Sequence, residues 1–532
     1  MDQLKDFGGK DTIEQIITLD IIRESGAVEA LPDLLELLAN PLGDNAVDEM
    51  VYHATCELLH NREADLIGGL RHASVTVRLL CIRQAGDDLM PATLPVLTGL
   101  LNEEASPEML AELLHTLAKF KAPSLVETLI PYLRHEDEAV AGLAMEALAA
   151  TGDVKAKEAL LALIKADLDA ITASGRCDLR TAMVLNSLAS FRDEEINAFL
   201  ISHIHHPTPS FRKVVISTLA AMGAVVLPAL EQCLEQGGKD ERIMAANIIG
   251  MTGQRKGADI LVAQFDKGGT LDSNLRFAIY EALGRINSLR SIIGLADGLA
   301  EEDELVLIAV VTSLNDLCNP GVVKNVNEAL AKGGAQSQRI MQAMVTARAG
   351  HLFRAVYEAG EHAAALIETA RHSGNQEALA VFRAQLGRVD GDQAAADRQR
   401  LEDVAPGAQA TRRVLAADDS KAILSFYKAV AADMGIELIT ANDGQEAFDF
   451  LQGATNTIDL LVTDMNMPNM DGIELTRALR QQAQWTSLPI LMATTESEKS
   501  QTDIAAQAGV NGFISKPFTK DQFKDKLATM FA

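Results

Sequence analysis

Four short apolar segments near the C-terminal end of the chain each end in polar residues that could do chemistry. These residues are Asp418 with Asp419, Asp464, Thr494 and Lys516. Open α/β sheets carry their sites at the carboxyl ends of parallel strands, so we expect the four groups to lie together.

Their chemistry suits phosphoryl transfer. A carboxylate such as Asp464 can attack phosphorus and form an acyl phosphate if the charge of the donor's oxygens is offset. Asp418, Asp419 and Asp464 would crowd three like charges, so they require a cation. Mg²⁺ takes oxygen ligands and keeps several waters, which makes it the expected cofactor.

Strands and helices alternate through this part of the chain. Such alternation predicts a parallel sheet covered on both faces, with the five-stranded flavodoxin-like order. The expected strands are 413–417, 436–441, 458–463, 488–494 and 511–515, and the expected helices are 420–433, 443–452, 472–482, 498–508 and 519–530.

Residues 412–532 resemble the receiver domain of two-component response regulators, and the pattern is nearest to the single-domain chemotaxis type. The sequence Asp464-Met-Asn-Met-Pro-Asn-Met-Asp471-Gly carries much of this resemblance. It implies that Asp464 is the phosphoacceptor. It also implies that Asp419 and Asp464 bind Mg²⁺ directly, that Asp418 binds it through water, and that the backbone carbonyl of Asn466 supplies a further ligand.

The resemblance assigns roles to the other strand ends as well. Lys516 would contact the phosphoryl oxygens, and the bond from Lys516 to Pro517 would be cis. Thr494, preferred over its neighbour Thr495, would donate its hydroxyl to the phosphoryl group. Phe513 would turn inward as Thr494 moves, changing the surface around 498–530. Many relatives carry tyrosine there, and phenylalanine lacks its hydroxyl.

Two polar residues flank the acceptor site and are expected to tune loss of the phosphoryl group. Asn466 and Glu496 lie two residues beyond Asp464 and Thr494. In chemotaxis-type relatives, similar side chains help to position the hydrolytic water. We therefore predict a short-lived phosphoryl group.

Residues 1–388 show an internal repeat of paired helices. Apolar residues at helical spacing alternate with short polar breaks, and a common turn position recurs near 26, 60, 86, 121, 152, 192, 223, 253, 287, 318 and 350. One such turn carries Gly152, which favours a left-handed helix end. Helical pairs with this period bury their apolar faces by stacking, which predicts an all-α superhelical solenoid. The pattern resembles HEAT repeats of the short bacterial kind.

The segment 389–411 breaks the repeat and is interpreted as a linker, helical over about 392–403. The expected organisation is thus multidomain, with a HEAT-like solenoid over 1–388, a linker over 389–411 and an α/β receiver over 412–532. A longer repeat unit near 165–192 indicates an inserted surface loop around Ala170.

Composition narrows the classes of partner and compartment. The formal charge is −27, and residues 412–532 hold 11 basic and 16 acidic side chains, so about −22 falls on the first 411 residues. Such a surface disfavours nucleic acid and anionic membrane, and it should prefer a basic partner face. Scattered cysteines, with no recognisable signal or membrane span, indicate a cytoplasmic protein.

We therefore expect a response regulator whose output is protein–protein interaction through the solenoid, not an enzyme in the usual sense. Its expected partners are a histidine kinase or histidine phosphotransfer protein, and a protein target of the solenoid. The last two receiver helices could also form a homodimer face. An alternative is a constitutive HEAT scaffold whose receiver serves as a phosphate sink or localisation tag.

Overall fold

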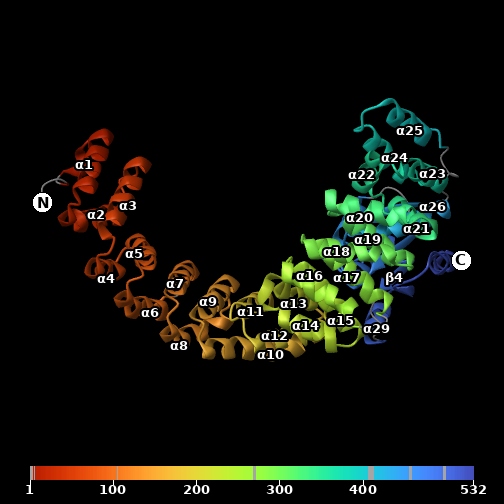
Figure 1. The fold of residues 1–532 in the computed structure, drawn as a ribbon. Coiled ribbons are helices and arrows are strands. Elements are labelled where there is room, and N and C mark those ends of the chain that lie inside the picture. Colours follow the sequence, from red (N-terminus) through yellow and green to blue (C-terminus); the bar gives the residue numbers. More distant parts are fainter. Residues whose placement is uncertain are drawn as a thin grey trace. The chain divides into compact units, whose positions relative to one another are not determined.

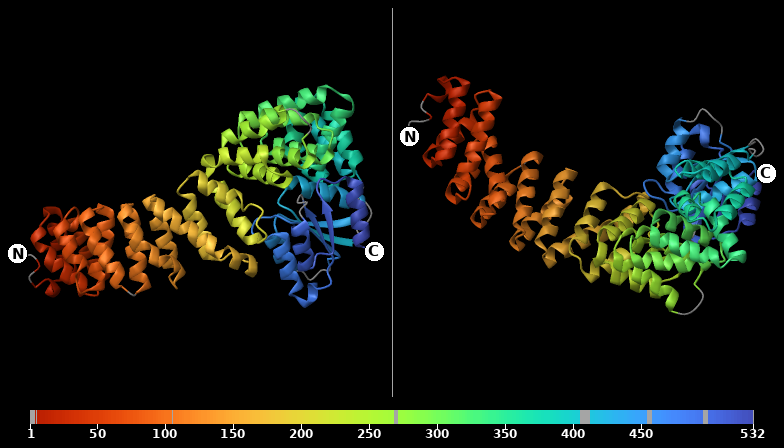
Figure 2. Two further views of the ribbon diagram at one scale, coloured as in Figure 1. Left: turned by 90° about the horizontal axis from the view of Figure 1, so that it is seen from below. Right: turned by 45° about the horizontal axis from the view of Figure 1, so that its top comes forward.

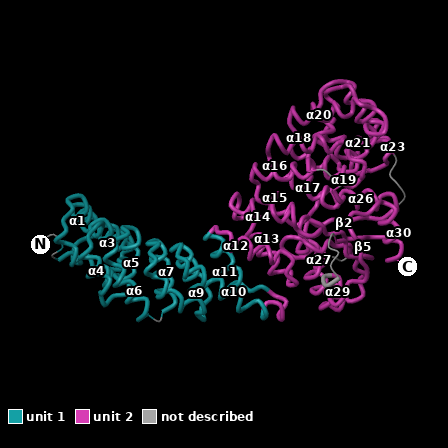
Figure 3. Tube along the Cα trace, turned by 60° about the horizontal axis from the view of Figure 1, so that its bottom comes forward, with its two compact units in different colours: residues 1–170, 177–191 teal, residues 171–176, 192–532 magenta. Residues whose placement is uncertain are grey.

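The computed structural model describes residues 4, 6–104, 106–267, 271–404, 412–453, 458–494 and 499–531. The chain forms two compact units, one of residues 1–170 and 177–191 and the other of residues 171–176 and 192–532 (Figure 3). No helix in the described ranges is both long and apolar enough to cross a membrane.

The first unit is built from stacked helical pairs (Figure 1). Helices α5, α7, α9 and α11 pack in succession as one row, and α4 and α6 belong to the opposite row. The helices are α1 (Thr12–Ser25), α2 (Leu31–Ala39), α3 (Asn45–Leu59), α4 (Glu63–Leu70), α5 (Val75–Asp88), α6 (Leu94–Glu103), α7 (Pro107–Phe120), α8 (Val126–Leu129), α9 (Glu138–Thr151), α10 (Val154–Ser174) and α11 (Leu179–Ala189). Of the extra residues that begin at Ala170, those up to Ser174 lengthen α10, and residues 175–178 form a loop that leads to α11.

The turns within the pairs lie where the repeat predicts them. Left-handed backbone occurs at or near nine of the predicted turn positions in the described chain: Gly26, Asn61, Leu89, Lys121, Gly152, Arg192, Gly223, Gly253 and Arg348. This conformation lets the chain reverse after one helix and start the next. Several of the positions carry a side chain, so the backbone geometry recurs even where glycine does not.

The second unit continues the pairs and then adds the sheet. Helices α15, α17, α19, α21 and α23 pack in succession, and α16, α18, α20, α22 and α24 form the other row. The bounds are α12 (Glu194–Ile201), α13 (Pro209–Ala221), α14 (Leu227–Gln236), α15 (Lys239–Met251), α16 (Arg255–Asp266), α17 (Ser273–Arg285), α18 (Leu289–Asp297), α19 (Glu304–Asp316), α20 (Pro320–Ala331), α21 (Gly334–Thr346), α22 (Gly350–Ala359), α23 (Ala363–Ser373) and α24 (Gln376–Leu386).

Part of the predicted linker folds onto the solenoid. Helix α25 (Asp392–Glu402) matches the helix expected over 392–403 and packs against α23 and α24. Asp397 on α25 accepts a hydrogen bond of 2.9 Å from the hydroxyl of Tyr357. Residues 405–411 of the linker lie outside the described residues. The division into domains at 388 and 412 stays a prediction.

The C-terminal part is a five-stranded parallel sheet in the order β2-β1-β3-β4-β5, as predicted (Figure 2). Helices α26 and α30 pack together on one face, and α27, α28 and α29 form a contiguous layer on the other. The elements are β1 (Arg412–Ala417), α26 (Lys421–Asp433), β2 (Ile436–Ala441), α27 (Gly444–Gly453), β3 (Leu460–Asp464), α28 (Gly472–Arg480), β4 (Ile490–Thr494), α29 (Lys499–Ala508), β5 (Gly512–Ser515) and α30 (Lys520–Met530). The predicted all-α and flavodoxin-like parts are both confirmed.

Two opposite substitutions at equivalent turns test the left-handed geometry. Lys121 and Gly152 both end a helix with positive φ, and a Cβ on Gly152 would meet no atom within 4 Å. Lys121→Gly should raise the free energy of unfolding by about 1 kcal/mol, and Gly152→Ala should lower it by about 1 kcal/mol. Thermal and urea unfolding measure both, and a loss of stability on Lys121→Gly would contradict the assignment.

Candidate functional site

The strand register brings the predicted polar groups to one edge of the sheet. Ala417 pairs with Thr463, so the residues that follow them, Asp418 and Asp464, leave neighbouring strands side by side. On the other side of Asp464, Thr494 ends β4 and pairs with Ser515, the residue before Lys516. Parallel strands place their carboxyl ends at the same edge, which explains why distant residues meet there.

Lys516 joins two of the carboxylates. Its Nζ donates to Asp418 Oδ2 at 2.7 Å and to Asp464 Oδ1 at 2.6 Å, and all three side chains are buried. Burial acts to lower the pKa of Lys516, but the charges of Asp418 and Asp464 outweigh it and raise that pKa well above its usual value. Burial also raises the pKa of Asp418 well above its usual value, and Lys516 counteracts only part of that shift.

Asp419 completes the acidic group from the mouth of the site. Its side chain is solvent-exposed, but the protein around it reduces its solvation. This loss of solvation, and then the charge of Asp464, raise the pKa of Asp419 to about 6. A single ammonium therefore does not neutralise the three carboxylates. Charge of this kind is what a divalent cation would offset.

The loop after β3 is held close to Asp464. The backbone N–H of Asn466 donates to Asp464 Oδ2 at 2.9 Å. A Cβ on Gly472 would lie 2.1 Å from the backbone oxygen of Asp464, so only glycine fits at the start of α28. Asp471 caps that helix by accepting from the N–H groups of Ile473 and Glu474 at 2.9 and 2.8 Å.

The other predicted residues lie nearby. Thr494 is buried, and its hydroxyl contacts Met465 Sδ at 3.8 Å. Phe513 on β5 is half-buried and packs against the cluster that contains Met465 and Met492. The peptide bond between Lys516 and Pro517 is cis, as expected. Thr495 and Glu496 lie outside the described residues.

A groove lies beside Phe513 on the β5–α30 side of the receiver. It encloses about 610 Å³. Its lining combines aromatic, polar and charged side chains, among them Phe513, Pro517, Phe518, Gln522, Asp525 and Lys526. This groove adjoins the surface that the sequence predicts will respond to Phe513.

The donor set fits Mg²⁺ better than a metal held by side chains alone. Within the described ranges, no three His, Cys, Asp or Glu side chains meet closely enough to hold an ion by themselves. Mg²⁺ usually takes one or two carboxylates and completes its shell with water. Asp419 and Asp464, with the backbone oxygen of Asn466 and waters, match that requirement.

Residues of the solenoid also reach this site, which the sequence analysis missed. Arg212 donates from Nη2 to Asn466 Oδ1 at 2.7 Å, and Glu281 accepts a hydrogen bond from Ser420 Oγ. A sequence signal for this docking exists: the run Leu305–Val311 on α19 is apolar on every side of the helix and is buried throughout. A helix that is apolar all round needs cover on all sides.

Comparison with known proteins places the sheet domain in a family. A model of the response regulator receiver domain matches residues 414–528, and a model of HEAT repeats matches residues 94–175. Chemotaxis protein CheY of Pseudomonas aeruginosa is 40% identical over 120 residues, which are 22% of this chain and 95% of that protein. The chain belongs to the response regulator family.

Other relatives of this response regulator match the same region. CheY-3 of Vibrio cholerae is 39% identical over 120 residues, which are 22% of this chain and 91% of that protein. The solved structure of Vibrio cholerae chemotaxis protein CheY4 is 36% identical and covers 23% of this chain and 99% of its own, with a TM-score of 0.22. The response regulator thus joins a CheY-like receiver to N-terminal HEAT repeats.

Removing the buried Lys516 ammonium should destabilise the protein, because the repulsion between Asp418 and Asp464 is then no longer offset. Lys516→Met leaves Asp418 and Asp464 buried without their cation, and we expect the free energy of unfolding at neutral pH to fall by about 3 kcal/mol. Millimolar Mg²⁺ should restore part of this loss, because it supplies the missing positive charge. Urea unfolding with Mg²⁺ or with chelator measures both effects, and equal losses under the two conditions would argue against a cation site.

Proposed function

We propose that Asp464 accepts a phosphoryl group from the phosphohistidine of a histidine kinase or phosphotransfer protein. An Asp464 carboxylate oxygen attacks phosphorus, a P–O bond forms, and the P–N bond to imidazole breaks. The imidazole nitrogen leaves with the electron pair of that bond and takes up a proton. The product is an acyl phosphate on Asp464.

The observation that carries this proposal is the position of the Lys516 ammonium. It follows the edge strand β5, two strands from β3, and donates to Asp464 Oδ1 at 2.6 Å, and it is buried. Charge appears on the phosphoryl oxygens beside that atom as the group arrives. A fixed cation there stabilises the transferring group without having to move.

Asp418, Asp419 and Asp464 also support a proposed Mg²⁺ site. Asp419 and Asp464 would bind the ion directly, with the backbone oxygen of Asn466, and Asp418 would act through water. The bound ion would supply positive charge to the phosphoryl oxygens and reduce their repulsion with the carboxylates. Asp464 is then free to approach phosphorus.

Phosphorylation is proposed to act on two groups beside the acceptor. Thr494 would donate to a phosphoryl oxygen, and Phe513 would turn into the space that Thr494 leaves. The ring of Phe513 is half-buried, so its further burial can bias the two states by about 1–2 kcal/mol. The response would then pass to the β5–α30 face and, through the solenoid, to a protein partner.

The phosphoryl group is proposed to leave by hydrolysis. Water attacks phosphorus, the P–O bond to the Asp464 carboxyl breaks, and inorganic phosphate and the free carboxylate result. Asn466 and Glu496 would orient that water.

The acceptor assignment is tested with a small donor that needs no partner. Incubated with phosphoramidate and Mg²⁺, the full chain should gain one phosphoryl group by intact-mass spectrometry, and Asp464→Asn should gain none. Asp521→Asn, an exposed carboxylate on α30, is the matched control and should behave like the wild type. Chelation of Mg²⁺ should abolish labelling, and a labelled Asp464→Asn variant would refute the assignment.

The role of Glu496 is tested by the lifetime of the label. Reversing its charge in Glu496→Lys should change the rate of phosphate release several-fold, because the hydrolytic water would lose its carboxylate neighbour. Phosphate release from the prelabelled chain gives this rate. An unchanged rate would count against the tuning role.

A further inference from the structure

The receiver is docked on the solenoid through its first helix. Helix α26 packs against α19, and both belong to the second compact unit (Figure 3). Six consecutive residues of α26, Ala422–Tyr427, are buried, as are seven of α19, Leu305–Val311. An amphipathic helix on a sheet would expose one side, so burial on all sides marks a helix covered by a further layer.

The polar rim of this contact is complementary in charge. Lys421 pairs with Asp316 at 2.8 Å. Lys428 pairs with Glu377 at 2.9 Å, and Lys520 pairs with Glu304 at 2.7 Å. Each exposed pair is worth little by itself, but all three place a receiver lysine on a solenoid carboxylate. The acidic solenoid thus finds a basic face within its own chain.

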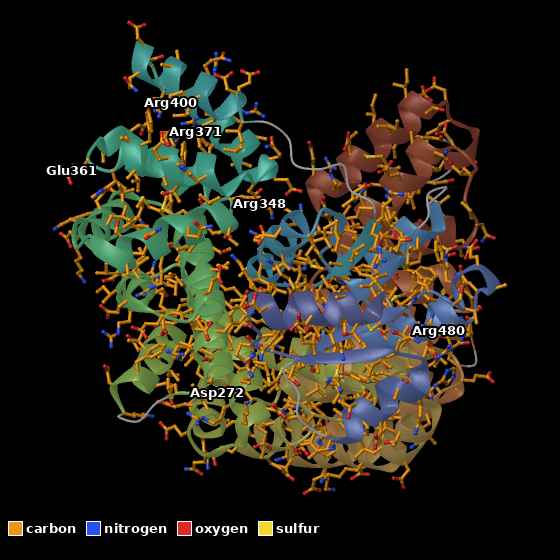
Figure 4. The ribbon with its side chains drawn as sticks, turned by 90° about the vertical axis from the view of Figure 1, so that its right-hand side faces the viewer. Asp272, Arg348, Glu361, Arg371, Arg400 and Arg480 are labelled. Carbon is orange, nitrogen blue, oxygen red and sulfur yellow. The ribbon has the colours of Figure 1, made fainter. Side chains whose placement is uncertain are left out.

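A fourth contact lies at the C-terminal end of the docked surface. Arg348 of the solenoid, which is labelled in Figure 4, donates from Nη2 to Ser425 Oγ on α26 at 3.1 Å and also pairs with Glu377. Ser425 is buried, and its hydroxyl lies on the side of α26 that faces the solenoid. The contact therefore fixes the rotation of α26 about its axis as well as its distance.

In this orientation, solenoid side chains lie close to Asp419, Ser420 and Asn466, which border the proposed acceptor Asp464. Glu281 accepts from the hydroxyl of Ser420, the residue after Asp419. Arg285, one helical turn further along α17, lies near enough to act on the charge of Asp419. Arg212 donates to Asn466 Oδ1 at 2.7 Å, and the backbone N–H of Asn466 donates to Asp464.

Arg212 uses one guanidinium nitrogen to bond the solenoid and the other to bond the receiver. It is 2% exposed, and its Nη1 donates to the backbone oxygen of His206 at 3.0 Å. That bond holds the guanidinium, while Nη2 points to the loop after β3. When Nη1 of a planar guanidinium is already hydrogen-bonded, Nη2 can bind an anion at little cost in conformational entropy.

An equivalent arginine in the first unit, Arg78, distinguishes the bond that Arg212 makes within its own turn from the bond that it makes to the receiver. Arg78 follows His72 by six residues, as Arg212 follows His206, and it donates from Nη1 to the backbone oxygens of His72 and Ala73. In both turns the histidine Nδ1 accepts a backbone N–H at 3.1 Å. The repeat thus explains the Nη1 bond of Arg212. The Nη2 bond to Asn466 is particular to the docked receiver.

We propose that Arg212 binds the phosphoryl group on Asp464, so that phosphorylation strengthens the docking of the receiver on the solenoid. The inference rests on the proposed phosphorylation of Asp464. A phosphoryl group adds close to two negative charges and three strong acceptors beside Asn466. Nη2 would exchange a neutral amide oxygen for a charged phosphoryl oxygen, which is the stronger acceptor.

The charges of the solenoid near Asp419 and Asn466 favour stronger docking after phosphorylation. Arg212 and Arg285 are positive, and Glu281 is negative and engaged with Ser420. A new anion at Asp464 is therefore attracted more than it is repelled. Because coupling is reciprocal, docking must in turn hold the phosphoryl group more tightly.

The test uses the full chain with Mg²⁺ and beryllofluoride as the phosphoryl stand-in. Fluorine NMR measures beryllofluoride affinity, and hydrogen exchange measures the protection of α19 and α26. In the wild type, beryllofluoride should slow exchange in both helices. In Arg212→Gln it should bind roughly tenfold or more weakly, and the slowing should be lost.

Matched variants keep folding separate from phosphoryl binding. Arg78→Gln removes the same repeat bond and should match the wild type in both measurements. Arg212→Lys keeps the charge but lacks the second arm, and it should show the same loss as Arg212→Gln. A wild-type response in folded Arg212→Gln, or faster exchange on beryllofluoride binding in the wild type, would overturn the inference. A wild type that does not bind beryllofluoride would overturn the proposed acceptor role as well.

Discussion

Three carboxylates at the carboxyl edge of one parallel sheet are the constraint on which the rest of the site depends. Asp418 and Asp464 leave adjacent strands, and the sheet register places them side by side. Lys516 relieves part of their repulsion from two strands away, at 2.7 and 2.6 Å. Loss of solvation, and then the charge of Asp464, still raise the pKa of Asp419 to about 6. One ammonium faces three carboxylates, and a further cation would offset the remaining negative charge.

The solenoid adds further charged side chains around the receiver. Its acidic residues meet Lys421, Lys428 and Lys520 at the docked face, while its cations, Arg212 and Arg285, lie towards the acceptor mouth. Solenoid carboxylates pair with the receiver lysines at the rim, and near the site two arginines stand beside one carboxylate, Glu281. An acidic protein surface would ordinarily repel a phosphoryl group. Here Lys516 donates to Asp464, Arg212 donates to the neighbouring Asn466, and Arg285 acts on the charge of Asp419.

The repeat shows how a structural residue can acquire a second role. Arg78 and Arg212 occupy the same place after His72 and His206, and each bonds a backbone oxygen of its own turn. The place of Arg212 in its turn comes from the repeat, although Arg212 is buried and Arg78 only half-buried, and the contact with Asn466 is made by the receiver loop after β3. A rigid, stacked scaffold therefore positions a side chain at a neighbouring domain more accurately than a loop would.

The sequence by itself determined the local elements and predicted which side chains meet at the carboxyl edge of the sheet. Apolar runs ending in Asp464, Thr494 and Lys516 were enough to place the strands within a few residues, because strand ends and polar termini coincide in parallel sheets. The repeat likewise marked turns such as Gly152, where glycine relieves a left-handed backbone. Only the tertiary structure decided which helix covers α26 and that Arg212 reaches Asn466. Arg212 and Asn466 are 254 positions apart, and nothing in the local pattern around either residue encodes the distance between them.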